Sequence, residues 1–364
     1  MDYTQKLKYH YRPKKSWIND PNGLVYFGGY YHVFYQHAPD FDVPWKQPMY
    51  WGHARTKDFL NWEELPVALV PDMEYDKRGC WSGTAIVKDD VLYLFYTSVI
   101  GEKYEIQTVS VAYSIDGIRF KKYEGNPVIR EFPKDGSCDF RDPAVCYVDG
   151  EYYCIMATGH KETKTGRLLL YRSKDLLDWR YVGVMSEWEG CMFTECPSFI
   201  PSNNGSLLSA SICPLEGRHY FNVMYGDFEN GKFTVNHIAE IDKGPDQYAG
   251  QVFRDHMGRN ILISWIPGWK YESYLPFDIG CMSVPREIKF IDGKITAYPV
   301  KELQHLLKNE DDSVKRMENG FVINRTNRDP VVYEGKIDDL KILRDGYVVE
   351  VFVNGGEEVY TVLL

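Results

Sequence analysis

The heptapeptide Trp17-Ile18-Asn19-Asp20-Pro21-Asn22-Gly23 opens a stretch that continues as LVYFGGYYHVFYQ to residue 36. Pro21 fixes its own φ angle and the Asn-Gly pair favours a tight turn, so the segment can hold one carboxylate in a fixed direction. The residues that follow alternate in polarity around a Gly-Gly pair, which predicts two strands joined by a hairpin turn. Taken alone, the heptapeptide is equally compatible with a polar turn that only precedes a strand.

The same arrangement recurs four more times along the chain. Each time a short polar, Gly-bearing or Pro-bearing segment precedes a hairpin of alternating apolar residues. The later units begin at Trp81-Ser82-Gly83, Arg141-Asp142-Pro143, Glu195-Cys196-Pro197 and Tyr248-Ala249-Gly250. A period of about 55 to 60 residues suits a four-stranded propeller blade. The sequence therefore predicts an all-β fold in which five repeats form a five-bladed β-propeller.

Three of the segments that open the repeats carry an acidic residue: Asp20, Asp142 and Glu195. In a propeller the first strand of every blade borders the central channel, so the opening segments gather at one mouth of that channel. We therefore expect these three carboxyl groups to converge, although they are far apart in the sequence.

The repeats end near residues 284–288, and the remaining chain has a different pattern. Val300, Leu303, Leu306 and Leu307 have the spacing of a short amphipathic helix, and an unpatterned polar stretch follows them. The tail alternates apolar and polar residues between Gly-containing turns. We predict a five-bladed propeller domain at 1–298, a short helix and linker at 299–319, and a small C-terminal β-sheet module at 320–364.

Composition narrows the classes of partner and compartment. The net charge of −10 argues against binding to nucleic acid or to an anionic membrane surface. The N-terminus has no apolar signal-peptide region, and no apolar run reaches the length of a membrane span. The eight cysteines form no CxxC pair, and His32, His37 and His53 have the spacing of strands, so we expect no metal site. These features predict a cytoplasmic protein with reduced thiols.

The three acids suit the cleavage of a glycosidic bond with retention. That reaction needs a carboxylate nucleophile and a second carboxyl group, about 5 Å away, that acts as acid and then as base. Arg141 is expected to keep the neighbouring Asp142 ionised, although the two could instead form a purely structural ion pair. Cys196 could be a nucleophile, but a cysteine on an inner strand with no histidine partner is more often a packing residue.

Several motifs occur in an order that resembles the β-fructofuranosidases of glycoside hydrolase family 32, the invertases, inulinases, levanases and sucrose-6-phosphate hydrolases. They are WINDPNG, FYQ, WGHARTKDFLNWEELPVAL, WSGTA, FRDP, ECP, YAGQ and VPREI. The resemblance implies that Asp20 is the nucleophile, Asp142 the transition-state stabiliser and Glu195 the acid/base. It implies a fructose pocket lined by Trp17, Asn19, Gln36, Trp45, Trp81, Ser82 and Arg141, with Tyr248 nearby. No metal or organic cofactor is implied.

The sequence departs from the family pattern in three places. Ser198 stands where many relatives have Asp, and Trp81 stands where Phe is usual. The tail is far shorter than the family's C-terminal β-sandwich, so we expect a reduced sandwich and leave the oligomeric state open.

Several functional alternatives remain open from the sequence. A fructosyltransferase uses the same intermediate, and a non-catalytic fructan-binding propeller would keep the same pocket. Sucrose, sucrose 6-phosphate and short fructo-oligosaccharides are all candidate substrates. The aromatic residues of 263–277 are candidates for an outer subsite.

Overall fold

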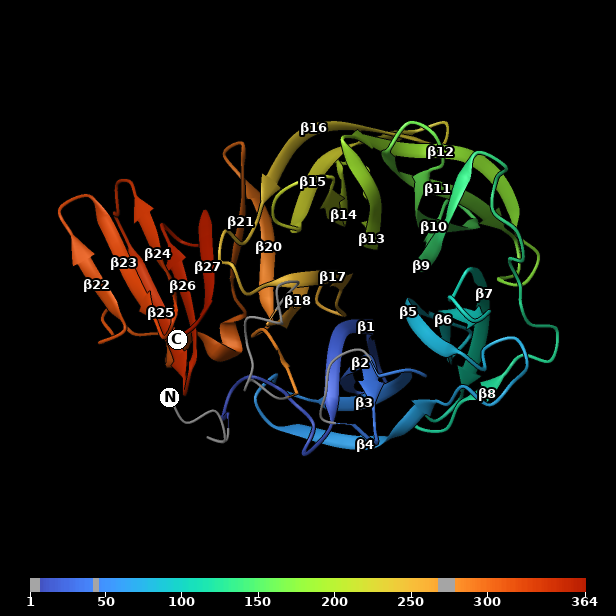
Figure 1. Ribbon diagram of the computed structural model, residues 1–364, viewed down its shortest axis with the longest axis horizontal. Helices are drawn as coiled ribbons and strands as arrows, with labels where there is room; N and C mark the ends of the chain where they lie inside the picture. The colour runs from blue at the N-terminus through green and yellow to red at the C-terminus, as the bar shows by residue number, and fades with distance from the viewer. Residues whose placement is uncertain (1–6, 42–45, 268–278) are drawn as a thin grey trace.

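The computed structural model describes residues 7–41, 46–267 and 279–364, and their regular secondary structure is almost entirely β-strand (Figure 1). The all-β class predicted from the sequence is therefore confirmed. No helix in the described ranges is long and apolar enough to cross a membrane.

Five sheets follow one another along residues 17–299, and each is assembled from strands that are consecutive in the chain. The first contains β1 (Trp17–Phe27), β2 (Tyr30–Ala38), β3 (Tyr50–Thr56) and β4 (Trp62–Leu69). The second contains β5 (Gly79–Lys88), β6 (Val91–Ile100), β7 (Ile106–Ser114) and β8 (Lys121–Lys122). The third contains β9 (Gly136–Val148), β10 (Glu151–His160), β11 (Thr165–Ser173) and β12 (Arg180–Glu189).

The fourth and fifth sheets repeat this plan. The fourth contains β13 (Cys191–Ile200), β14 (Ser206–Pro214), β15 (Tyr220–Glu229) and β16 (Lys232–Glu240). The fifth contains β17 (Tyr248–Arg254), β18 (Asn260–Ile266), β20 (Arg286–Ile291) and β21 (Lys294–Pro299), and β19 (Cys281–Met282) also pairs with β18.

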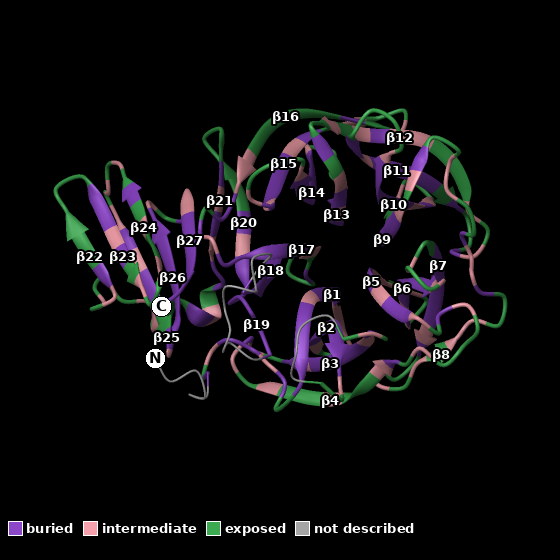
Figure 2. Ribbon diagram, viewed as in Figure 1, coloured by how far each residue is buried: buried purple, intermediate pink, exposed green. Residues whose placement is uncertain are grey.

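The first strands of neighbouring sheets lie side by side around a common centre (Figure 1). Strand β1 contacts β5, β5 contacts β9, β9 contacts β13, β13 contacts β17, and β17 in turn contacts β1. We call this circular arrangement of the five sheets the ring. Apolar faces of adjacent sheets pack together; for example, Ile155 of β10 and Leu208 of β14 belong to one buried cluster. Figure 2 shows that exposed residues are concentrated in the outer strands β4, β12 and β16.

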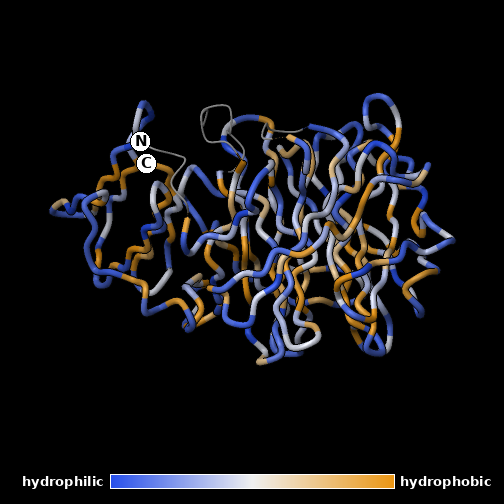
Figure 3. The backbone as a smooth tube through the Cα atoms, turned by 90° about the horizontal axis from the view of Figure 1, so that it is seen from below, coloured by the Kyte–Doolittle hydropathy of each residue, from blue (hydrophilic) through white to orange (hydrophobic). Residues whose placement is uncertain are grey.

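The hairpin turns lie where the sequence predicts them. Gly28 and Gly29 join β1 to β2, and both have positive φ angles, which favour glycine. Asp149 and Gly150 join β9 to β10 in the same way, with φ angles of 47° and 90°. Viewed from below, hydrophobic residues follow the strands and hydrophilic ones lie mainly in the connections (Figure 3).

The opening motifs differ from the prediction, because they lie inside the first strands and not in turns before them. Each first strand shifts its pairing register at its motif, as a β-bulge does. Asp142, Cys196 and Ala249 sit at these bulges with φ angles of 59°, 47° and 53°. A bulge turns side chains away from the regular alternation, so it can direct a polar side chain toward the centre of the ring.

The C-terminal region corrects two details of the prediction. Residues 301–306 form a 3-10 helix, η2 (Lys301–Leu306), and the expected linker contains a strand, β22 (Val314–Met317). The tail forms two three-stranded sheets instead of one: β22 with β23 (Gly320–Arg325) and β24 (Arg328–Glu334), and β25 (Leu340–Asp345) with β26 (Val348–Val353) and β27 (Glu358–Leu363). The linker looked unpatterned because only Val314 of β22 is buried.

Both C-terminal sheets contribute to one buried cluster, which includes Phe321 of β23 and Val351 of β26. The second sheet also packs on the ring, since Phe352 shares a cluster with Ile288 of β20. The N-terminal segment returns to the same region, where backbone N–H groups of Lys8, Tyr9 and His10 donate to Asp345.

Candidate active site

A pocket of about 440 Å³ brings the three predicted acids together. The pocket is lined by Asn19, Asp20, Gln36, Gln47, Met49, Trp81, Ser82, Tyr104, Arg141, Asp142, Glu195, Tyr248 and Trp265. Asp20 comes from β1, Asp142 from β9 and Glu195 from β13, so three of the five sheets each supply one carboxyl group. The three carboxyl groups therefore converge, as the repeat predicts.

Asp20 is held by neutral donors on both oxygens. The Ser82 hydroxyl donates to Oδ2 at 2.7 Å, and the Asn19 side-chain amide donates to Oδ1 at 3.2 Å. Trp17 donates its indole N–H to Asn19 Oδ1 at 3.1 Å, which orients that amide. Burial and the charge of Glu195 raise the pKa of Asp20. Hydrogen bonds from Ser82, Asn19 and the Cys196 thiol lower it. Within the described ranges, this carboxyl group is fixed by neutral donors and forms no ion pair with a cation.

Asp142 lies deeper and is fixed through backbone groups. The Cys196 N–H donates to Asp142 Oδ2 at 2.9 Å, and the Asp142 N–H donates to the Thr97 hydroxyl oxygen at 2.9 Å. Burial and the charges of Glu195 and Asp20 raise the pKa of Asp142 to about 7, although the charge of Arg141 lowers it. This group therefore holds a proton more readily than an ordinary aspartate.

The ion pairs of Arg141 correct a prediction from the sequence. Arg141 pairs with Glu195, through Nη2 at 3.0 Å, and with Asp139, through Nη1 at 2.7 Å. Its charge lowers the pKa of Asp142, as expected, but burial and the neighbouring carboxylates have the larger effect. The alternative of a structural Arg141–Asp142 pair fails, since the guanidinium turns to the two other carboxylates.

Glu195 is partly exposed, and its two oxygens have different partners. Oε1 accepts from Arg141 Nη2 and Nε, at 3.0 and 3.3 Å. Oε2 accepts from the Tyr248 hydroxyl at 2.8 Å and lies 3.2 Å from the sulfur of Cys213. The side chain is 15% exposed, so a substrate in the pocket can reach it.

Cys196 lies between two of the acids. Its sulfur is 3.6 Å from Asp20 Oδ2 and 3.7 Å from Asp142 Oδ2. Burial and the adjacent carboxylates raise the pKa of this thiol well above its usual range, so it stays protonated. A buried thiol of this kind is a poor nucleophile, in agreement with the packing role favoured by the sequence.

The remaining predicted pocket residues fall into three groups. Asn19, Gln36, Trp81, Ser82, Arg141 and Tyr248 line the pocket directly. Trp17 is fully buried behind it, where it donates to Asn19 and packs edge-on against the pocket residue Trp265. Trp45 lies outside the described residues, as does most of the aromatic segment proposed for an outer subsite.

Sequence reasoning missed four lining residues: Gln47, Met49, Tyr104 and Trp265. Gln47 Oε1 accepts the Trp81 indole N–H at 3.2 Å, and the Tyr104 ring packs on Trp81 with centroids 5.7 Å apart. Of these four, only Trp265 could have been found from the sequence, because it belongs to the aromatic 263–277 segment considered for an outer subsite. The other three lie in connections that have no repeat pattern.

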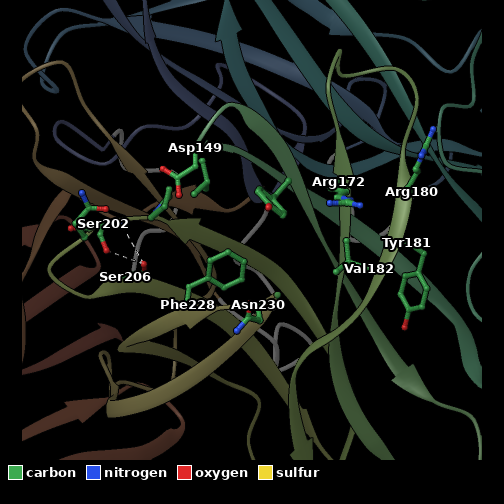
Figure 4. A pocket seen from close by; sticks show the side chains of 14 residues that line it. Asp149, Arg172, Arg180, Tyr181, Val182, Ser202, Ser206, Phe228 and Asn230 are labelled. Carbon is green, nitrogen blue, oxygen red and sulfur yellow. Dashed lines mark hydrogen bonds between the residues drawn. The ribbon is translucent and has the colours of Figure 1, made fainter.

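Two further observations bear on other kinds of site. Across the described ranges, no three His, Cys, Asp or Glu side chains are grouped as metal ligands would be. A second hollow of about 730 Å³ lies between the third and fourth sheets, with Asp149, Arg172, Ser202 and Phe228 among its lining residues (Figure 4). It holds no cluster of carboxyl groups.

Comparisons with known proteins agree with this geometry. The family described as "Glycosyl hydrolases family 32 N-terminal domain" matches residues 10–299. A sucrose-6-phosphate hydrolase of Zymomonas mobilis is 37% identical over 327 residues, which are 83% of this chain and 63% of that protein. A raffinose invertase of Escherichia coli is 36% identical over 320 residues, 82% of this chain and 65% of that protein. The chain thus spans less than two thirds of the length of these relatives.

Solved structures resemble the whole chain. A Bombyx mori GH32 β-fructofuranosidase superposes with a TM-score of 0.85 at 29% identity, covering 99% of this chain and 89% of that one. A mutant of the same silkworm enzyme, solved in complex with sucrose, also gives a TM-score of 0.85, at 28% identity over 99% of this chain and 89% of that one.

Proposed function

The chain belongs to glycosyl hydrolase family 32, and from this premise we propose that it is a retaining glycoside hydrolase that releases fructose. Its substrates would be sucrose, sucrose 6-phosphate or short fructo-oligosaccharides. The observation that carries the proposal is one pocket containing Asp20, Asp142 and Glu195, each held by different partners. Relatives named sucrose-6-phosphate hydrolase and raffinose invertase support the substrate class.

In the first step Asp20 attacks the anomeric carbon of the fructosyl unit while Glu195 donates its proton to the leaving oxygen. The bond to the leaving sugar breaks, and an ester forms between Asp20 and fructose. Neutral donors from Ser82 and Asn19 orient the nucleophile without a competing cation. In the second step Glu195, now a carboxylate, takes a proton from water, which cleaves the ester and releases fructose.

Asp142 and the polar lining residues would bind the fructosyl hydroxyl groups. Asp142 can accept one hydroxyl hydrogen bond and, when protonated, donate another. Asn19 and Gln36 add side-chain amides on the same pocket surface. Trp81 offers an apolar indole face against which a sugar ring can pack.

The finer architecture is also part of the proposal. We infer that the five successive sheets are five blades of a propeller and that the two C-terminal sheets are a reduced β-sandwich. The circular contacts of the first strands and the shared buried cluster of the tail support this division. We keep the predicted boundaries at 1–298, 299–319 and 320–364 with one change. Strand β22 falls within 299–319 but belongs with the C-terminal sheets.

Two single substitutions test the proposed chemistry. Asp20→Ala and Glu195→Ala should each lower kcat for sucrose by about 10³-fold or more, since each removes a bond-making group. Near-normal fructose release by either variant would contradict the assignment. Circular dichroism should show the same β spectrum for both variants and the wild type.

A substrate panel decides the leaving group. Initial rates on sucrose, sucrose 6-phosphate and short fructans should identify the preferred substrate by kcat/KM. Products at high sucrose separate hydrolysis from transfer: free fructose indicates hydrolysis, and longer oligomers indicate transfer to sugar. A cytoplasmic location belongs to the same proposal, supported by the fact that none of the eight cysteines forms a disulfide.

A further inference from the structure

Cys213 touches the proposed acid/base residue but is not part of the pocket wall. It lies on β14, opposite Phe193 of β13, and is fully buried. Its sulfur is 3.2 Å from Glu195 Oε2 and 2.9 Å from the Tyr248 hydroxyl oxygen. The Tyr248 hydroxyl is itself 2.8 Å from the same Glu195 oxygen. The three groups therefore form a closed triangle on the side of Glu195 opposite Arg141.

The thiol in this triangle is neutral and can donate to Glu195. Burial and the charge of Glu195 raise the pKa of the Cys213 thiol, which favours its protonated form. An S–H group is a weaker donor than an O–H group, but it favours the ionised form of a carboxyl group that accepts from it. Because Cys213 does not line the pocket, any effect on a substrate must pass through Glu195 or Tyr248.

We propose that Cys213 is a positioning residue for Glu195, which fixes one carboxyl oxygen beside Tyr248 and adjusts how tightly that carboxyl group holds its proton. This inference rests on the proposed function, in which Glu195 gives up a proton and recovers it in every cycle. Arg141 donates to Oε1, whereas Tyr248 and Cys213 contact Oε2, so each oxygen of Glu195 is held by its own partners.

Other charged and titratable groups also face Glu195, and they stay constant when Cys213 is changed. They are Arg141 and Asp142 on β9, Asp20 on β1, Tyr248 on β17, Cys191 and Cys196 on β13, and His219 ahead of β15. Any pH profile is shared among these coupled groups, so the informative quantity is the difference between variants.

The test is the pH profile of kcat/KM for Cys213→Ala and Cys213→Ser. The value of kcat/KM should fall at alkaline pH as Glu195 loses its proton, and this fall is the alkaline limb of the profile. Removing the donor makes the ionised form less favourable, so Cys213→Ala should move this limb to higher pH by about half a unit. Cys213→Ser keeps a donor and should return the limb to the wild-type position or below it. An unmoved or downward-shifted limb in Cys213→Ala overturns the proposal.

Two further measurements separate this role from simple packing and from the proposed function. Cys154→Ser is the matched control, a buried thiol in another cluster, and it should lower the Tm without moving the limb. Carbon-13 NMR of the glutamate carboxyl carbons, assigned with Glu195→Gln, reports the Glu195 titration without any turnover. Fructose release absent in the wild type would reject the proposed function, whereas a Glu195 titration unchanged in Cys213→Ala would reject this inference alone.

Discussion

Asp142 illustrates at the residue scale how a functional site departs from the arrangement that would be most stable. The side chain is 2% exposed, and burial together with two neighbouring carboxyl groups raises its pKa to about 7. Its backbone also adopts a φ of 59°, which is unfavourable for most residues but tolerated by Asp and Asn. Both features are consistent with selection for sugar binding over stability.

Asp142→Asn should stabilise the folded protein and abolish most of its activity. Between the ordinary aspartate pKa and about 7, the unfolded chain releases this proton while the folded protein keeps it, so stability falls as pH rises. The amide never ionises, and Asn tolerates the same positive φ angle as Asp. We expect a gain on the order of 2 kcal/mol in the free energy of unfolding at pH 8, and little gain at pH 4.

Urea denaturation of both proteins at the two pH values measures this difference. The kcat for the best substrate should fall by about 100-fold or more, since the proposed function assigns Asp142 to binding the fructosyl hydroxyl groups. Equal free energies of unfolding for variant and wild type at pH 8 would mean that ionising Asp142 does not destabilise the folded protein.

At the scale of single elements, the β-bulges decide where the site residues point. The hairpins and their turns could be predicted from the sequence, because Gly-Gly and Asp-Gly pairs and alternating polarity are local signals. The bulges could not, because a register shift depends on the partner strand. The bulge at Cys196, for instance, exists only as a mismatch between β13 and β14.

Gly83→Ala should damage the site through the bulge in β5. A Cβ atom on Gly83 would lie 2.0 Å from the carbonyl oxygen of Phe95 on β6, so the two strands must move apart. Ser82, which precedes Gly83, would then shift relative to Asp20. We expect a loss of about 1–3 kcal/mol in stability. We also expect kcat to fall by about 100-fold, because the nucleophile loses its fixed orientation.

Gly226→Ala is a matched control for this prediction. Its Cβ atom would lie 2.0 Å from the carbonyl oxygen of Thr234, also at a register shift, but on the outer strands of the fourth sheet. Thermal unfolding should show a similar drop in Tm for both variants, while kcat should stay near the wild-type value only in Gly226→Ala. Equal activity losses would show that the effect is global instability.

At the scale of the whole molecule, a buried ionic network links the two chain ends to the ring. His10 Nδ1 is 3.1 Å from Asp345 Oδ2, and His10 Nε2 is 3.1 Å from Glu350 Oε1. Glu350 also pairs with Arg286 on β20 at 3.0 Å, and Arg286 pairs with Asp242 at 2.7 Å. All five side chains are almost fully buried, so the network joins the C-terminal sheets to the ring.

This network could not be predicted from the sequence. His10 and Asp345 are 335 residues apart, and neither belongs to a motif. The convergence of Asp20, Asp142 and Glu195 is also long-range, yet the repeat predicted it because equivalent positions of a repeat occupy equivalent places. The C-terminal contacts have no such regularity.

His10→Gln should reduce stability in a pH-dependent way. Burial alone would lower the pKa of His10, but hydrogen bonds to Asp345 and Glu350 and their charges raise it to about 9. The contribution of the imidazolium is therefore complete below pH 6.5 and is lost as pH rises through 9. We expect the variant to lose about 3 kcal/mol at pH 6 and much less at pH 10.

Tm measured across this pH range tests the network. His256→Gln is the control, because His256 is exposed and stacks on Tyr26 outside any ionic network. Its Tm should follow the wild-type profile with a constant offset. A constant offset for His10→Gln as well would show that His10 is not charged in the folded protein.

In the proposed mechanism one carboxylate, brought to the centre of the ring by β1, forms a covalent bond with the sugar. Mass spectrometry of peptides from enzyme mixed with an activated fructoside and quenched in acid tests this directly. Glu195→Gln slows release and should accumulate the intermediate. The account predicts one added hexosyl unit on the peptide that contains Asp20, absent in Asp20→Asn. A hexosyl unit on another peptide, or inverted product with no adduct on any, would contradict it.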